Sequence, residues 1–184
     1  TKAKSVIRDC SNRHDIIEFM ENIMVPVMER IGIDWEKGKL ALSQVYMSGR
    51  ISEEIVRELI ALPGMEKKIH PVTAIATLQD HHALGKRLVY SALTVCGYDV
   101  LDYGVGLRVD DLVQKVQEDK VRILLISTLM LKSALKIKAL KTALENRGRA
   151  VKLIVGGAPF RFDKNLYQEV GADATADNAS RAVG

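Results

Sequence analysis

The first third of the chain carries apolar residues at intervals of three and four, the period of an amphipathic helix. One such stretch runs from His14 to Ile31, and a second runs from Leu42 to Leu62, where a Pro-Gly pair stops it. We expect Pro26 to kink the first helix because proline lacks a backbone N–H, and Gly32 to end it because glycine favours helix termination. Residues 1–64 are therefore predicted to form a small, entirely helical domain.

Beyond a basic linker at residues 65–71, short β-branched or apolar runs alternate with helical segments. The predicted strands span residues 72–78, 98–103, 122–127, 151–155 and 173–175. The predicted helices span residues 85–96, 109–118, 133–146 and 164–170, with a last one from residue 177. This alternation is typical of a parallel sheet covered by helices on both faces. Residues 72–184 should therefore form an α/β domain, a doubly wound five-stranded parallel sheet of flavodoxin-like order.

The composition is that of an ordinary globular protein, with 47% hydrophobic and 27% charged residues. No apolar run reaches the ~18 residues that a membrane-spanning helix needs. We expect no secretory signal, because no apolar segment follows the basic residues at positions 2 and 4. Two cysteines in 184 residues are too few for a disulfide framework, so we expect a cytoplasmic protein. The net charge of +4 is spread over interleaved acidic and basic residues and does not by itself indicate nucleic-acid binding.

Polar residues and glycines gather in three loops that follow predicted strands. They are Asp80, His82 and Gly85 after the first strand, Ser127 and Leu129 after the third, and Gly156 and Gly157 after the fourth. In doubly wound folds, ligands bind at the carboxyl ends of the strands, so all three loops lie at the expected ligand edge. Each motif alone is equally well explained by helix capping or a tight turn, and only their combination indicates a function.

In order and spacing, these residues resemble the cobalamin-binding signature D-x-H-x-x-G, S-x-L and G-G of corrinoid proteins in methyltransferase systems. The stretch from Trp35 to Gln44 resembles the helical cap that precedes this domain in methionine synthase and in those corrinoid proteins. The resemblance covers about residues 14–183. It implies a Rossmann-like domain that binds cobalamin, and hence cobalt, behind an all-helical cap.

The resemblance also assigns roles to individual residues. His82 would be the lower axial ligand of cobalt in place of the cofactor's own base, which is the base-off/His-on arrangement. Asp80 would accept a hydrogen bond from the other ring nitrogen of His82, and Ser133 would extend this pair into a triad whose proton occupancy couples ligation to methyl transfer. The expected lining of the slot for the nucleotide tail is Gly85, Ser127, Leu129, Gly156 and Gly157. From the cap, Trp35 and Leu42 would cover the upper face of the corrin.

A chain of this kind would carry a methyl group between two partners. One is a substrate-specific methyltransferase, and the other is an acceptor methyltransferase that uses tetrahydrofolate or a thiol, so that catalysis is shared with the partner enzymes. The resemblance also leaves room for a reductive activator and for a second copy of the chain as partners. It implies neither a membrane nor a nucleic-acid partner.

Two other interpretations remain open at this point. A cobalamin-dependent sensor uses a similar cap, although such proteins usually add a DNA-binding module. The triplet Asp80-His81-His82 also matches the DHH-type phosphoesterases, whose two-metal chemistry needs further aspartates, of which Asp102 is the only obvious one. The family cap normally has four helices, whereas two are visible here. Three explanations are open: the cap of this protein has fewer helices, the cap is completed by another copy or a partner, or the chain is cut.

Overall fold

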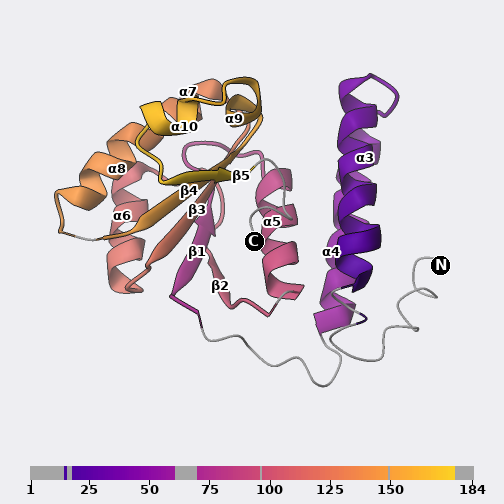
Figure 1. Cartoon of the computed structure of the whole chain (residues 1–184), viewed down its shortest axis with the longest axis horizontal. Helices are drawn as coiled ribbons and strands as arrows, with labels where there is room; N and C mark the ends of the chain where they lie inside the picture. The colour runs from indigo at the N-terminus through magenta and orange to yellow at the C-terminus, as the bar shows by residue number, and fades with distance from the viewer. Residues whose placement is uncertain (1–14, 16–17, 61–69, 96, 149, 177–184) are drawn as a thin grey trace.

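The computed structural model describes residues 15, 18–60, 70–95, 97–148 and 150–176. A helical hairpin stands beside an α/β domain (Figure 1). The sheet contains five strands, all parallel, in the order β2-β1-β3-β4-β5. They are β1 (Thr73–Ala76), β2 (Val100–Asp102), β3 (Ile123–Thr128), β4 (Lys152–Gly157) and β5 (Ala174–Ala176). This order confirms the predicted flavodoxin-like topology.

Helices cover both faces of the sheet. On one face α6 (Val109–Glu118) and α8 (Ile137–Glu145) pack over the larger core. Its fully buried members include Leu112, Val116, Leu124, Ile126, Ile137 and Leu140. On the other face, α5 (Leu84–Val95) packs over a smaller cluster that contains Ile75 and Leu125. Because side chains alternate along a strand, neighbouring residues of β3 contribute to opposite cores.

The short helices after β3 and β4 differ from the sequence prediction in number or in length. The single helix expected over residues 133–146 is divided at Lys136 into α7 (Leu131–Leu135) and α8. A further short helix, α9 (Ala158–Phe162), follows β4 directly, and α10 (Leu166–Glu169) lies inside the predicted 164–170 segment. The helix expected from residue 177 and most of the predicted linker at 65–71 lie outside the described residues.

The hairpin consists of α3 (Val25–Glu36), extended at its start by a π-helical segment (Met20–Met24), and α4 (Leu42–Ile60). The π-helical hydrogen bonds immediately precede Pro26, which has no N–H to offer the regular ladder. The expectation that Gly32 ends the first helix is wrong. The helix continues to Glu36, and the chain turns at Gly38, which has a φ of +69°.

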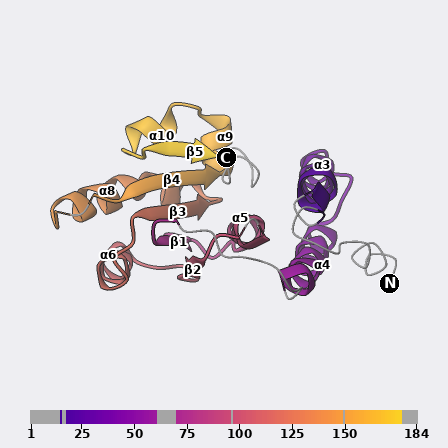
Figure 2. The same ribbon diagram turned by 60° about the horizontal axis from the view of Figure 1, so that its bottom comes forward.

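The hairpin contacts the α/β domain through α4, which packs along α5. Both helices run from the carboxyl edge of the sheet toward the amino edge (Figure 1), and the turned view in Figure 2 again places the hairpin beside α5. At the contact, a Cβ on Gly49 would lie 2.5 Å from the Cδ1 atom of Leu84. The missing side chain therefore permits the close approach of the two helices. None of the described helices has the length and apolar character needed to cross a membrane.

Candidate functional site

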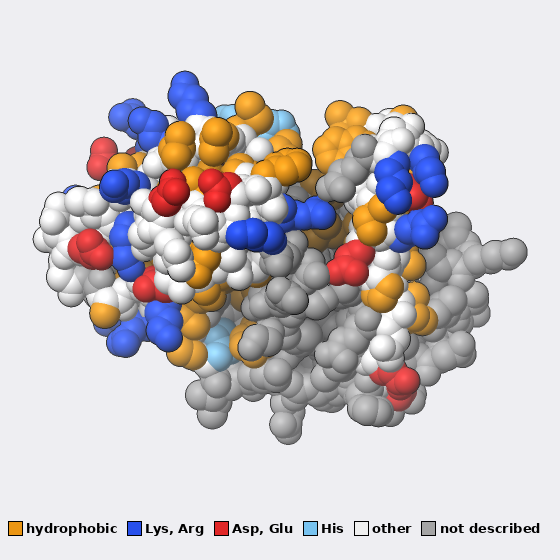
Figure 3. Space-filling model, turned by 45° about the horizontal axis from the view of Figure 1, so that its top comes forward, with side chains coloured by type: hydrophobic (Ala, Val, Ile, Leu, Met, Phe, Trp, Pro, Cys, Tyr) orange, Lys and Arg blue, Asp and Glu red, His pale blue; other side chains and the backbone are white. Residues whose placement is uncertain are grey.

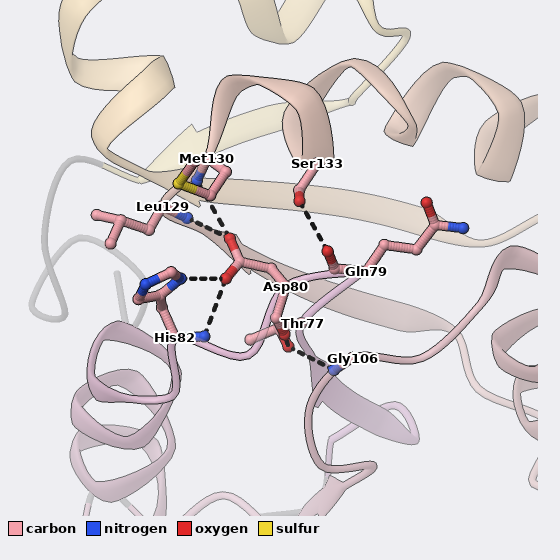
Figure 4. A network of polar contacts seen from close by, with 8 residues as sticks. All are labelled: Thr77, Gln79, Asp80, His82, Gly106, Leu129, Met130 and Ser133. Carbon is pink, nitrogen blue, oxygen red and sulfur yellow. Dashed lines mark hydrogen bonds and ion pairs between the residues drawn. The ribbon is translucent and has the colours of Figure 1, made fainter.

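The carboxylate of Asp80 is the centre of a polar network at the carboxyl edge of the sheet (Figure 4). Its side chain is 0% exposed. The Oδ1 atom accepts hydrogen bonds from the backbone N–H of His82 at 2.9 Å and from the Nδ1 atom of its ring at 2.7 Å. The Oδ2 atom accepts from the backbone N–H groups of Leu129 at 2.8 Å and Met130 at 3.2 Å. The carboxylate thus joins the loop after β1 to the loop after β3.

This arrangement keeps Asp80 ionised. Burial on its own would raise the pKa of the carboxyl, but the hydrogen bonds from His82, Leu129 and Met130 outweigh it and hold the pKa below its usual value. An ionised carboxylate can only accept, so the Nδ1 atom of His82 carries a proton. In the neutral ring, the Nε2 atom then has a free lone pair. Since the His82 side chain is 56% exposed, a ligand at this edge of the sheet can reach it.

Ser133 does not extend the pair as expected. Its hydroxyl, buried in α7, donates a hydrogen bond to the backbone carbonyl of Gln79 at 3.0 Å. The oxygen of Asp80 that a triad would require is occupied instead by the Leu129 and Met130 N–H groups. Ser133 therefore holds the backbone beside Asp80 and not the carboxylate itself.

Of the five residues expected to line the nucleotide slot, Gly85, Ser127 and Gly156 lie at the same face of the sheet. Ser127 and Gly156 are register partners in β3 and β4, and they point to the face that α5 covers. Gly85, next to the start of α5, approaches this pair, because a Cβ on it would lie 3.0 Å from the Ser127 hydroxyl oxygen. The strip of sheet beside α5 is thus made of small, partly exposed residues.

The backbone conformation at position 157, and the nearby backbone of Thr128, leave no room for a side chain, so this position requires glycine. It has a φ of +117°, and a Cβ there would lie 1.8 Å from the carbonyl oxygen of Thr128. The two-glycine motif therefore meets close backbone on both sides of β4, since a Cβ on Gly156 would lie 3.0 Å from the carbonyl oxygen of Ala176 in β5 and Gly157 is the register partner of Thr128 in β3. The Thr128 hydroxyl is buried without a hydrogen-bond partner.

Trp35 and Leu42, which we expected to cover the corrin, lie at the end of the hairpin that extends beyond the carboxyl edge of the sheet (Figure 1). Leu42 lies about two helical turns before Gly49 in α4, so it extends beyond the start of α5. Leu42 is 67% exposed and Trp35, at the end of α3, is 39% exposed. On the α/β side, Leu129 is also exposed, beside Asp80. Figure 3 shows hydrophobic side chains both on this end of the hairpin and on the facing edge of the α/β domain, next to a histidine.

Sequence reasoning missed an ion pair beside the site. Lys86, buried in the first turn of α5, binds the carboxylate of Asp102 at the end of β2. The same carboxylate oxygen accepts the backbone N–H of Gly104 at 2.8 Å. A lysine directly after the glycine of D-x-H-x-x-G and an aspartate at a strand end were both visible in the sequence, but nothing there indicated that they pair.

The side chains of the site suit a metal ion that is already bound within a cofactor. Among the described residues, no group of three or more His, Cys, Asp or Glu side chains is placed to hold a metal ion. The site offers one imidazole nitrogen, oriented by a buried carboxylate, beside an open strip of small residues. His82 would supply this nitrogen to the cobalt of a bound corrinoid, and the small residues would leave room for the rest of the cofactor, so the residues present fit cobalamin.

Comparisons with known proteins agree on one family. A family model described as B12 binding domain matches residues 70–184, and a second model of the same description matches residues 2–60. Dimethylamine corrinoid protein 3 of Methanosarcina acetivorans is 32% identical over 170 residues, which cover 90% of this chain and 79% of that protein.

Two solved structures extend the comparison. The monomethylamine corrinoid protein of Methanosarcina barkeri superimposes with a TM-score of 0.64 at 30% identity, covering 85% of this chain and 75% of that one. The methanol:cobalamin methyltransferase complex MtaBC of the same organism gives a TM-score of 0.59 over 98% of this chain and 74% of that one. At 19% identity, this second likeness concerns the fold alone.

Proposed function

The chain belongs to the cobalamin-binding corrinoid proteins of methyltransferase systems, and from this premise we propose that it carries a methyl group between two methyltransferases with His82 bound to cobalt. When bound, the cofactor supplies the cobalt atom that accepts and releases the methyl group. The observation that carries the proposal is the hydrogen bond of 2.7 Å between the Nδ1 atom of His82 and Asp80, which leaves Nε2 available to the metal.

The protein's contribution begins with the axial ligand. An imidazole whose Nδ1–H donates to a carboxylate is a more basic ligand with one defined tautomer. The pKa of Asp80 is lowered, so its carboxylate stays available as the acceptor that orients the His82 ring. His82 would hold the cobalt through Nε2, and the Asp80–His82 pair would link cobalt ligation to methyl transfer.

The strip beside α5 would receive the displaced nucleotide tail. Gly85, Ser127 and Gly156 leave room there, and backbone groups can approach the tail closely because these residues are small. Trp35 and Leu42 would shield the upper face of the corrin from water. Leu129 would contact its lower side, next to the axial ligand.

The partners of the cycle are a donor and an acceptor methyltransferase. The names of the relatives favour methylamines as the source of the methyl group, and the MtaBC complex is a precedent for a corrinoid protein of this fold assembled with a methyltransferase. A thiol or tetrahydrofolate acceptor, a reductive activator and a cytoplasmic location are part of the same proposal.

Spectroscopy of the purified chain with bound cobalamin tests the proposal. In protein labelled with ¹⁵N-histidine, the EPR spectrum of the cobalt(II) form should show the two-line superhyperfine splitting of one ¹⁵N ligand, and His82→Ala should abolish it. The cofactor's own base contains ¹⁴N and would give three lines. His81→Ala is a matched control, because His81 is the neighbouring residue and its ring lies against Gly106. Two-line splitting that survives in His82→Ala, or is lost in His81→Ala alone, would contradict the assignment of the ligand.

A further inference from the structure

Thr77, just beyond the end of β1, has a hydroxyl group with two backbone partners (Figure 4). The residue is 0% exposed. Its hydroxyl donates a hydrogen bond to the backbone carbonyl of Asp80 and accepts one from the backbone N–H of Gly106 at 3.0 Å. A single buried hydroxyl therefore links the loop that carries Asp80 and His82 to the loop that follows β2.

The main chains of these two loops are also joined along their length. The N–H of Thr77 donates to the carbonyl of Gly104 at 3.2 Å, and the N–H of Gln79 donates to the carbonyl of Leu107 at 2.9 Å. The N–H of Gly106 donates to the carbonyl of Asp80 at 2.9 Å in addition to its bond with Thr77. The backbone position of Asp80, and hence the direction of its carboxylate, depends on this set of contacts.

We propose that Thr77 is a positioning residue for the cobalt ligand, acting on His82 through the backbone of Asp80. This inference rests on the proposed function for its meaning, but its geometry is that of the chain alone. Asp80 orients the His82 ring by a hydrogen bond, and Thr77 binds the backbone carbonyl of Asp80. Loss of the hydroxyl would leave that carbonyl with the Gly106 N–H alone, so the backbone of Asp80 would be held less firmly and the His82 ring would be oriented less strictly.

The chain provides a matched control on the same strand. Thr73, at the start of β1, is also buried, and its hydroxyl also donates to a backbone carbonyl, that of Pro71 at 2.8 Å. It lies at the amino end of the strand, away from His82. Thr77→Val and Thr73→Val each exchange a buried hydroxyl for a methyl group of similar volume, so a general loss of stability affects both variants. A change at His82 would affect only the first.

The first measurement uses the protein without cofactor. Ring ¹⁵N–¹H correlation spectra at pH 8.5 report which nitrogen of His82 carries the proton. We expect the wild-type protein, Thr77→Ser and Thr73→Val to show predominantly the Nδ1–H form, and Thr77→Val to show a mixture of both tautomers. An unchanged His82 signal in folded Thr77→Val would overturn the proposal, whatever the protein does with cobalamin.

The second measurement uses each variant with bound cobalamin in the cobalt(II) form. Thr77→Val should lower the fraction of nitrogen-ligated cobalt about three- to tenfold, because partners behind a metal ligand typically change affinity by this order or more. Thr77→Ser should restore the fraction, and Thr73→Val should leave it at the wild-type value. If Thr77→Val does not fold, Thr77→Cys takes its place, since a thiol is a weak donor and acceptor. A wild-type spectrum without nitrogen splitting would contradict the proposed function, while the tautomer measurement would still decide the role of Thr77.

Discussion

Each carboxylate oxygen of Asp80 accepts two hydrogen bonds, and an amide cannot do the same because its NH₂ group only donates. In Asp80→Asn, the side-chain NH₂ group would face two donors, either the pair on His82 or the backbone N–H groups of Leu129 and Met130. We expect a loss of about 2 kcal/mol in the free energy of unfolding, the usual cost of buried donors without acceptors. Urea denaturation measures it. Asp163→Asn is the control, because the exposed Asp163 accepts one backbone N–H, and it should change stability little.

The stability difference between the wild type and Asp80→Asn should depend on pH. The pKa of Asp80 is lowered in the folded protein, so its stabilising effect is complete above the ordinary aspartate pKa of about 3.9 and is lost as the pH falls through the lowered value. The difference in unfolding free energy between wild type and Asp80→Asn should therefore shrink as the pH falls below about 4. Other aspartates with lowered pKa values, such as Asp173, affect both proteins equally. A difference that grows as the pH falls from about 4 would contradict this account.

Gln79 has a φ of +49°, in the left-handed region that non-glycine residues avoid. The strain of ~1–2 kcal/mol exceeds the ~0.5–1 kcal/mol that glycine loses through its greater freedom in the unfolded chain. Gln79→Gly should therefore raise the free energy of unfolding by about 0.5–1 kcal/mol without weakening cobalamin binding. Lys120→Gly, at a φ of +55° after α6, provides a positive control of the same kind. A destabilised Gln79→Gly next to a stabilised Lys120→Gly would show that the glutamine side chain has a role of its own.

At the scale of elements, the sequence pattern predicted the α/β domain well because each strand is a short buried run between helices. The matched bounds of α6, whose first turn contains Asp110 and Asp111, show how informative acidic residues in the first turn and a clear period are. The pattern failed where helices are too short to show a period, as in α7 and α9. Gly32 misled the prediction because glycine inside a helix costs only about 1 kcal/mol, which a helix can tolerate, so α3 continues to Glu36.

The site shows a similar division. Asp80, His82 and the glycines were predictable because their chemistry depends on side-chain type at a fixed spacing. The contacts made by Leu129, Met130 and Gly106 were not predictable, since every residue except proline offers the same N–H group. Thr77 escaped notice for a related reason: its hydroxyl binds backbone atoms, so no partner side chain marks it in the sequence.

At the scale of the molecule, the contact between Gly49 and Leu84 sets the position of the hairpin relative to the α/β domain. We expect Gly49→Leu to separate α4 from α5, because a second leucine side chain would need the space that the Leu84 side chain fills between the two helices. Small-angle X-ray scattering should show a larger radius of gyration. Quenching of the single tryptophan, Trp35, by added cobalamin should also be weaker than in the wild type.

Gly32→Leu is the control for this prediction. Gly32 also lies within a helix of the hairpin, but a Cβ there meets nothing within 4 Å. The same glycine-to-leucine exchange should therefore leave both the radius of gyration and the quenching of Trp35 unchanged. If Gly49→Leu behaves like Gly32→Leu, the hairpin is not held against α5 by this contact.

The backbone donors at residues 129 and 130 have a consequence for how such a protein can diversify. Because Asp80 is held by peptide N–H groups, these contacts do not depend on which side chain, proline excepted, the two positions carry. The exposed position 130, which has no proposed contact with the cofactor, can therefore accumulate substitutions and adapt to a new partner enzyme while His82 keeps its alignment. A library randomised at Met130 alone should yield many variants with an altered surface and, apart from proline, few with a damaged metal site.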